Sequence, residues 1–288
     1  MEPINKITLR QKVKAYRRTP GSFALRILVT AAAAVTIAVL VGLVGYILIQ
    51  GIPHLTPEVF AWEYNSENVS MTPAIFNTLY MTGLTLLFSV PIGIFSAIYL
   101  VEYAKRGNRL VKIIRLTTET LAGIPSIVYG LFGYILFVLA LHWQYSLLAG
   151  AVTLAVMILP ILVRTTEEAL MAVPDSFREG SFGLGAGKLR TIFSIVLPSA
   201  VPGILSGIIL SIGRIVGESA ALIFTAGTYA AIPSSVFDSA RTLSVHMYAL
   251  LNEGLYTDQA YATAVVLLAL VVGINALSAA AAKKLIKR

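Results

Sequence analysis

Hydrophobic residues gather into six long runs along the chain, and short polar segments separate these runs. A helix that crosses a bilayer core needs roughly 20 residues at about 1.5 Å per residue, and each run is near that length. The pattern therefore predicts an all-α integral membrane protein with six transmembrane helices. Residues 1–26 are expected to form a basic N-terminal arm and residues 27–288 the six-span domain. The predicted spans cover residues 27–50, 73–101, 116–141, 146–163, 198–226 and 259–282.

The composition supports this class and narrows the chemistry. The chain is 57% hydrophobic and 12% charged, with a mean hydropathy of +0.81, which excludes a soluble domain. It has no cysteine, so it forms neither a disulfide nor a thiolate metal site, and its three histidines lie far apart in the sequence. The net charge of +8 does not indicate a nucleic-acid partner, because the basic residues flank the predicted spans.

The distribution of charge predicts the orientation in the membrane. With six spans, all but two of the 22 Lys and Arg residues fall on one side. They lie in the N-terminal arm, in the connection after the second span, in the stretch 164–198 and at the C-terminus. Basic loops prefer the cytoplasmic side, so both termini and the stretch 164–198 are expected in the cytoplasm. The outer loops hold one basic residue, Arg241.

The stretch 164–198 is the longest polar interval after residue 120, and its sequence predicts ordered structure. Pro174, Asp175 and Ser176 form a helix-start signal, which predicts a short helix over residues 176–184. Glycines then permit a tight turn, and a second amphipathic helix is expected over residues 189–196. Such a helix-turn-helix on a membrane surface presents a rigid contact surface to a soluble partner. The alternative is an ordinary pair of interfacial helices.

The spacing within this stretch resembles the "EAA" loop of ABC importer permeases. The motif is carried by Glu179-Gly180-Ser181, Gly185, Ile195 and Leu197-Pro198. Gly180 and Ser181 stand where two alanines are usual in that family, and both are small. The resemblance implies a cytoplasmic coupling helix that docks on a partner ATPase. The residues expected to serve this coupling are Ser176, Phe177, Arg178, Glu179, Gly180, Ser181 and Gly185.

A glycine-rich segment at residues 183–188 looks like a phosphate-binding P-loop, but it lacks two required residues. That motif needs glycine five positions before Gly187 and Ser or Thr after Lys188, where this chain has Phe182 and Leu189. The chain is therefore not expected to bind ATP by this motif, and no cofactor, metal or catalytic role is predicted for it.

Arg214 lies inside the predicted fifth span, near its middle. A charge at that depth costs at least ~2.5–3.5 kcal/mol, so it usually lines a pathway or forms a pair. Glu218 is four residues further on and is expected to share the helix face of Arg214. Two interpretations stay open, which are a gated anion site and a structural ion pair. Glu119, near the inner end of the third span, is either a further pathway residue or an interfacial carboxylate.

Further segments resemble phosphate-specific ABC importer permeases of the PstA type, a type I ABC importer subunit. They are residues 121–133, Gly213-Arg214 with residues 217–226, and residues 259–268. One departure is Ala221, where the family often has proline. The resemblance implies a PstC-type permease partner, two PstB-type ATPases that bind ATP and Mg²⁺, and an external phosphate-binding protein. It also implies a prokaryotic plasma (inner) membrane location.

We interpret the chain as a non-enzymatic permease subunit of an ATP-driven phosphate importer. A guanidinium fork matches phosphate oxygens. A carboxylate such as Glu218 can accept a hydrogen bond from the proton of monohydrogen phosphate, which sulfate lacks at neutral pH. The alternatives are a permease for sulfate or molybdate, or an anion transporter that works without ATP. Residues 242–251 are expected to form an outer helix with Ser244 and Tyr248 exposed, facing the binding protein together with residues 56–70.

Overall fold

The computed structural model describes residues 20–105 and 107–286, which form helices joined by loops. The chain divides into two units, one that ends at Gln50 and one that comprises Gly51–Arg288. The described part of the first unit consists of α2 (Pro20–Gly51), which is apolar on all sides. None of its most hydrophobic window is buried within the chain, as expected for a helix surrounded by lipid. The predicted first span is therefore confirmed as a helix. Residues 1–19 of the predicted N-terminal arm lie outside the described residues.

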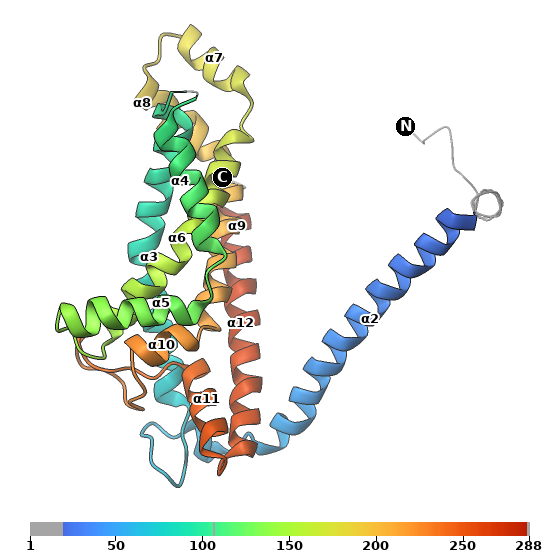
Figure 1. Cartoon of the computed structure of the whole chain (residues 1–288), viewed down its shortest axis with the longest axis vertical. Helices are drawn as coiled ribbons and strands as arrows, with labels where there is room; N and C mark the ends of the chain where they lie inside the picture. The colour runs from blue at the N-terminus through green and yellow to red at the C-terminus, as the bar shows by residue number, and fades with distance from the viewer. Residues whose placement is uncertain (1–19, 106, 287–288) are drawn as a thin grey trace. The chain divides into compact units, whose positions relative to one another are not determined.

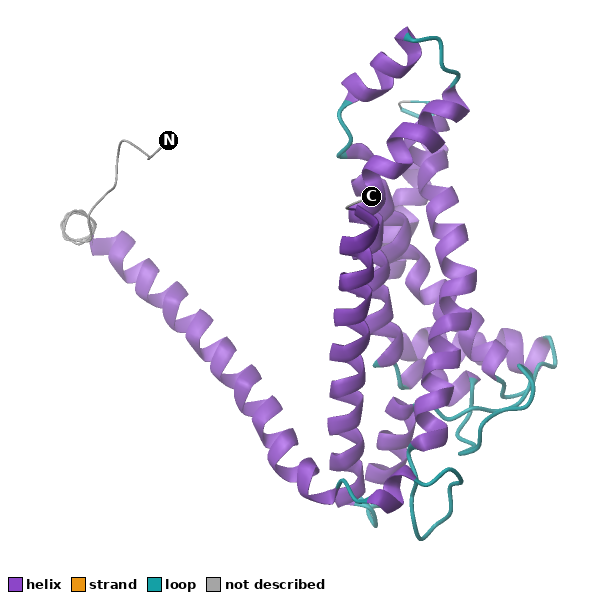
Figure 2. Cartoon of the chain, turned by 180° about the vertical axis from the view of Figure 1, so that it is seen from behind, coloured by secondary structure: helices purple, strands orange, loops and turns teal. Residues whose placement is uncertain are grey.

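The second unit is a bundle of long helices with shorter helices at both ends and across its middle. The long helices α3, α6, α9 and α12 run side by side, with α7 at one end and α11 at the other (Figure 1). Seen from behind, the described residues contain helices and loops and no strand (Figure 2). The elements are η1 (Ile52–His54), η2 (Pro57–Phe60), α3 (Thr72–Ile98), η3 (Tyr99–Tyr103), α4 (Arg109–Ala122), α5 (Ser126–Gly133), η4 (Tyr134–Ala140), α6 (Leu147–Met171), α7 (Asp175–Gly183), α8 (Lys188–Thr191), η5 (Ile192–Val196), α9 (Leu197–Val216), α10 (Ala220–Thr225), α11 (Leu243–Glu253) and α12 (Thr257–Ile286).

Five helical segments in the described residues are long and apolar enough to cross a membrane. The predicted third span is not one straight helix, which corrects that part of the six-span prediction. It is a pair of helical segments, Val111–Ala122 and Ser126–Ala140, bent by 104°. The bend falls at the Gly123–Pro125 junction, where Pro125 restricts the backbone of the residue before it. The number of spans is six when this bent pair counts as one.

Three predicted span boundaries were wrong, namely the end of the fourth span and both ends of the fifth. The fifth span was expected to end at Ala226, but α9 stops at Val216 and Ala220–Thr225 form the separate α10. The fourth span continues as α6 to Met171, eight residues beyond the predicted end at Val163. The fifth crossing helix begins at Lys188 and ends at Val216, because the predicted second amphipathic helix runs into it without a break. Polar residues at the ends of spans do not end a helix, since water hydrates them there. The segment between the two spans is therefore shorter than predicted.

The core of the second unit is built around α6, whose side chains Leu154, Ile158 and Leu162 are almost fully buried. Glycines allow the neighbouring helices to approach its backbone closely. A methyl group added at Gly203 or Gly207 of α9 would collide with Ala169 or Thr165 of α6. A methyl group at Gly93 of α3 would collide with Leu162 of α6. These glycines therefore allow α9 and α3 to pack closely on α6.

Candidate functional site

The predicted coupling helix is present as α7 (Asp175–Gly183), within one residue of the expected range. It lies at the end of the bundle that also carries α4 and α8 (Figure 1). Pro174 precedes it, and Asp175 provides an acidic residue in the first turn, which complements the positive end of the helix dipole.

The exposed surface of α7 and of the turn that follows it carries large apolar side chains, although the surrounding sequence is polar. Phe177 and Phe182 are about half exposed, and Leu184 is 92% exposed. Ser176, Glu179 and Gly180 are also exposed. Exposed apolar side chains rimmed by polar residues are typical of a protein interaction surface. Four of the seven residues that the sequence singled out for coupling, Ser176, Phe177, Glu179 and Gly180, are thus accessible to a partner.

Two of the seven predicted coupling residues point into the chain. The hydroxyl of Ser181 is buried and lies 2.8 Å from that of Thr191 in α8, which ties α7 to the next helix. The side chain of Arg178 is only 14% exposed and faces Glu102 in η3. These two residues hold α7 in place, while its other side chains remain on the surface.

Arg178 is the main anchor of α7. Its Nε and Nη2 donate to Glu102 Oε1 at 3.1 and 2.8 Å. Its Nη2 and Nη1 also donate to the carbonyl oxygens of Leu170 and Val173, at 2.9 and 2.8 Å, at the end of α6. Asp175 adds a longer contact of 3.3 Å. A guanidinium can satisfy all of these acceptors at once because its donors have a fixed planar arrangement.

Gly185, the seventh residue, forms the turn after α7 with a φ of +83°. Its amide donates to the carbonyl of Phe182, and the amide of Ala186 donates to that of Ser181. Only glycine adopts this backbone conformation without strain, which is the physical reason for its place in the motif.

We predict that Gly185→Val uncouples the transporter, because a β-branched residue at this φ costs about 1–2 kcal/mol or more and distorts the turn. Transport-linked ATP turnover should fall, while the amount of inserted protein stays normal. Gly187→Val is the matched control, since Gly187 has a φ of −73° and open space around it. Equal activity of the two variants would contradict the prediction.

Glu119 lies on α4 and is exposed, close to a group of paired charges. Arg115, expected to be its neighbour, forms an ion pair with the buried Glu167 of α6. Arg164 pairs with Glu168 at 3.0 Å on the exposed surface of α6. Glu119 lines a small cavity with these residues and acts electrostatically on Arg164. This position, at the α7 end of the bundle, favours the interfacial carboxylate over a residue deep in the pathway.

Arg214 and Glu218 do not share a helix face, which corrects the prediction. The helix α9 ends at Val216, so Glu218 lies in the non-helical junction before α10. Among the described residues no ion pair joins the two side chains. Instead, Glu218 Oε1 accepts from the amide of Ala221 at 3.2 Å, at the start of α10. The interpretation of this pair as a structural ion pair therefore has no support in the geometry.

Polar groups from three other elements lie around the end of α9 and the α9–α10 junction. The charge of Arg214 acts on Tyr129 of α5, whose buried hydroxyl donates to Leu121 O at 2.8 Å. Asn275 of α12 lies against Gly213, and its Oδ1 is buried without a hydrogen-bond partner in the described residues. The hydroxyl of Ser244 in α11 donates to the carbonyl of Glu218. Arg214 and Glu218 are themselves partly exposed.

Two of the segments that carry the family resemblance, residues 121–133 and 217–226, pack directly against each other. Helices α5 and α10 lie across the long helices and contact each other (Figure 1). A methyl group at Gly130 of α5 would stand 2.8 Å from Cα of Ala221, and one at Gly133 would collide with Thr153 and Thr225. The departure at Ala221 is thus a fully buried contact residue of this crossing.

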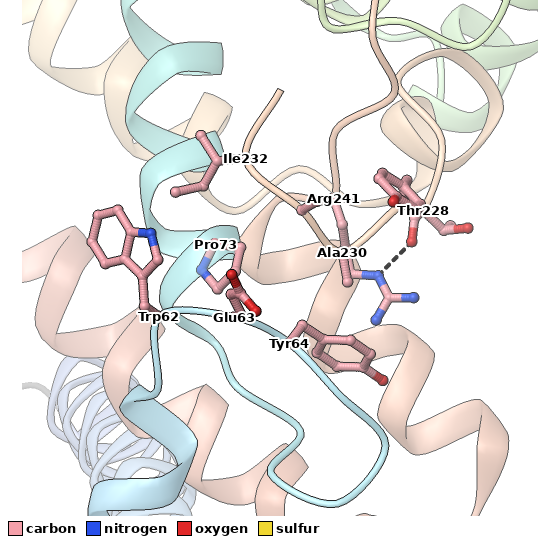
Figure 3. Close-up of a pocket in the computed structure, with 10 residues that line it drawn as sticks. Trp62, Glu63, Tyr64, Pro73, Thr228, Ala230, Ile232 and Arg241 are labelled. Atoms are coloured by element: carbon pink, nitrogen blue, oxygen red, sulfur yellow. Dashed lines mark hydrogen bonds between the residues drawn. The ribbon is translucent and has the colours of Figure 1, made fainter. Parts of the chain in front are cut away.

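An outer cavity of about 560 Å³ lies at the opposite end of the bundle from α7. Figure 3 shows Arg241 at its side, with Nε donating to Thr228 O at 2.7 Å. The guanidinium carbon stands 5.4 Å from the ring centre of Tyr64, and Trp62 and Glu63 complete this wall. The single basic residue of the outer loops therefore belongs to a defined cavity.

The helix predicted over residues 242–251 is present as α11 (Leu243–Glu253), but the expected exposure of Ser244 was wrong. Ser244 is buried because it contacts the α9–α10 junction, whereas Tyr248 is exposed. His246 is also buried, and this burial together with the neighbouring Arg241 lowers the pKa of His246 to about 4. His246 is consequently neutral at pH 7.

The sequence reasoning missed Glu102, Glu167, Tyr129 and Asn275. Two of them could have been found from the sequence. Tyr129 lies within residues 121–133, which carry the family resemblance, and Asn275 is a polar amide inside an apolar run. No local sequence pattern indicates Glu102 and Glu167, because their partners Arg178 and Arg115 are distant in the sequence.

Residues 89–288 match the family described as "Binding-protein-dependent transport system inner membrane component". The chain belongs to this family. It is thus a multi-pass membrane component of a transport system that works with a binding protein.

Two relatives and one solved structure illustrate the similarity. The chain is 35% identical over 241 residues to a probable ABC transporter permease protein, YqgI, of Bacillus subtilis, covering 78% of this chain and 82% of that protein. It is 43% identical over 164 residues to the phosphate transport system permease protein PstA 1 of Mycobacterium tuberculosis, covering 57% of this chain and 53% of that protein. An inward-facing structure of the MetNI methionine ABC transporter has a TM-score of 0.63 and 21% identity, covering 75% of this chain and 95% of that one, and shows the shared fold.

Proposed function

We propose that this chain is a permease subunit of an ATP-driven phosphate importer in a prokaryotic plasma (inner) membrane. It forms half of the translocation pathway and performs no catalysis itself. Its partners are a PstC-type permease, two PstB-type ATPases that bind ATP and Mg²⁺, and an external phosphate-binding protein. The substrate assignment rests on one observation, the 43% identity to a phosphate transport permease.

The coupling role is supported by the form of α7. This helix presents Phe177 and Phe182 outward while Arg178 fastens it to the ends of α6 and η3. A helix that is exposed on one side and anchored on the other transmits a displacement of its partner to the spans. An ATP-independent anion transporter would have no use for this arrangement.

The transport role of Arg214 is supported by its surroundings. Its guanidinium has no carboxylate partner among the described residues, its charge acts on Tyr129 of α5, and it lies two residues before the end of α9. Its partial exposure leaves room for the second permease subunit to complete the site. An arginine fork in such a place fits a tetrahedral oxyanion.

The test is uptake by proteoliposomes that contain the chain with its cognate partner subunits. We expect uptake of radioactive phosphate that requires ATP inside and the loaded binding protein outside. Sulfate and molybdate at equal concentration should not compete. Preferred uptake of sulfate or molybdate would establish the rival oxyanion permease, and uptake without ATP would establish a secondary transporter.

The proposed orientation places α7 in the cytoplasm and α11 outside. Single cysteines can test it directly because the chain has none of its own. Cysteines at the exposed positions Ser66 and Asn252 should react with an impermeant thiol reagent in intact spheroplasts. A cysteine at the exposed Ser176 should react only after the membrane is opened. The reverse pattern would overturn the topology.

A further inference from the structure

A basic cavity of about 690 Å³ lies between the end of the α3–η3 helix, α4 and the start of α7. Five cationic side chains line it, Lys105, Arg109, Lys112, Arg115 and Arg178. It lies at the α7 end of the bundle, where a span ends and the amphipathic α4 begins (Figure 1). In a membrane protein such a junction is at the level of the lipid headgroups.

Three of these five cations lack an anionic partner within the described part of the chain. The carboxylates that line the same cavity, Glu102 and Asp175, are both engaged by Arg178. Arg115 is engaged by Glu167. Lys105, Arg109 and Lys112 form no ion pair with a described carboxylate, and all three are exposed. Their charges therefore converge on the cavity without neutralisation.

An exposed apolar strip continues directly from these cations. Ile113 and Leu116 are 62% and 64% exposed, and each lies four residues after Arg109 or Lys112 on α4. Residues at this spacing are neighbours on a helix surface. The cavity thus offers positive charge to a headgroup and, beside it, apolar surface to an acyl chain.

We infer that this cavity binds the phosphate group of an anionic phospholipid. Basic pockets beside membrane helices on the cytoplasmic side suit such headgroups, and Lys and Arg donate charge-assisted hydrogen bonds to phosphate oxygens. Free phosphate could use the same cations, but it would have no use for Ile113 and Leu116. The inference depends on the membrane placement of the chain and is independent of the transported substrate. A bound lipid would contact the wall formed by Arg178 and Glu102, which carries α7.

Native mass spectrometry of the purified full chain in detergent tests this inference. The protein is titrated with phosphatidylglycerol and, separately, with phosphatidylcholine of the same acyl chains. The wild type should prefer phosphatidylglycerol. The triple variant Lys105→Gln, Arg109→Gln, Lys112→Gln should lose about tenfold or more of that preference, since each basic residue near an anionic headgroup contributes roughly a fivefold factor. The control Lys283→Gln, Lys284→Gln removes two exposed charges of α12 and should change the preference less than about twofold.

A competition arm separates the two sources of phosphate. Inorganic phosphate, added at an ionic strength matched with chloride, should not displace phosphatidylglycerol from the wild type. Displacement at matched ionic strength would assign the cavity to free phosphate and overturn the inference. Equal preference of the triple variant and the control would overturn it too. If the triple variant does not purify, Lys105→Gln and Lys112→Gln carry the test singly, each with an expected loss of about two- to fivefold.

Discussion

Arg214→Lys is expected to lower phosphate uptake by about tenfold or more while the importer still assembles. Lysine keeps the positive charge but loses the planar fork that binds two phosphate oxygens at once. A loss of about 1.4 kcal/mol in transition-state stabilisation corresponds to one factor of ten. The measurement is uptake in proteoliposomes at matched protein level. Arg190→Lys, at an exposed position in α8, is the control and should transport normally.

The double variant Arg214→Ala, Glu218→Ala separates a transport site from a structural pair. Because no ion pair joins the two side chains, their effects on thermal stability should add, with an interaction free energy within about 0.5 kcal/mol of zero. The double variant should assemble with its partners and carry no phosphate. Uptake near the wild-type rate in the double variant would place the transport site elsewhere.

Arg178→Ala is expected to detach α7 from the bundle and abolish coupled transport. Removing one member of a buried pair typically costs about 3–5 kcal/mol, because the partner is left charged and unpaired. Here Glu102, with a side chain only 9% exposed, would lose its cation, and the carbonyls of Leu170 and Val173 would lose a donor. Hydrogen exchange should become faster in residues 175–183, and ATP turnover should no longer respond to substrate.

The matched control is Arg164→Ala on the same bundle. Arg164 pairs with Glu168, but the two side chains are 63% and 59% exposed, so solvent screens this pair and its loss should leave the thermal stability close to that of the wild type. Exchanging the charges, with Arg178→Glu and Glu102→Arg together, should recover part of the stability. The recovery should be incomplete, because an arginine at position 102 would not donate hydrogen bonds to the carbonyls of Leu170 and Val173 as Arg178 does. Normal coupling in Arg178→Ala would show that α7 is held by other contacts.

Hydropathy predicted the number and approximate location of the spans because a lipid-facing helix must be apolar over a fixed length. It did not predict the bend of the third span. Proline alone was no guide, since Pro91, Pro160 and Pro202 all lie inside continuous helices. At Pro125 the preceding Gly123 and the new packing of α5 on α10 allow the chain to turn. That packing depends on residues far along the sequence.

Local spacing predicted the coupling helix and the Gly185 turn, because helix caps and a positive φ have local causes. The i,i+4 rule succeeded for Arg164 and Glu168 but failed for Arg214 and Glu218, since the helix ends between the latter two. The contact between Arg178 and Glu102 joins residues 76 positions apart, so no local pattern could indicate it.

The glycine contacts around α6 have a mechanical consequence. Gly93, Gly203 and Gly207 allow α3 and α9 to pack so closely on α6 that sliding one helix along another would cause steric clashes. The helix α6 also leads, after three residues, into α7. A displacement of α7 should therefore tilt α3, α6 and α9 together as one rigid body. We expect the bending that accompanies this tilt to be confined to two non-helical junctions, 123–125 and 217–219, which would act as hinges. The second junction contains Glu218.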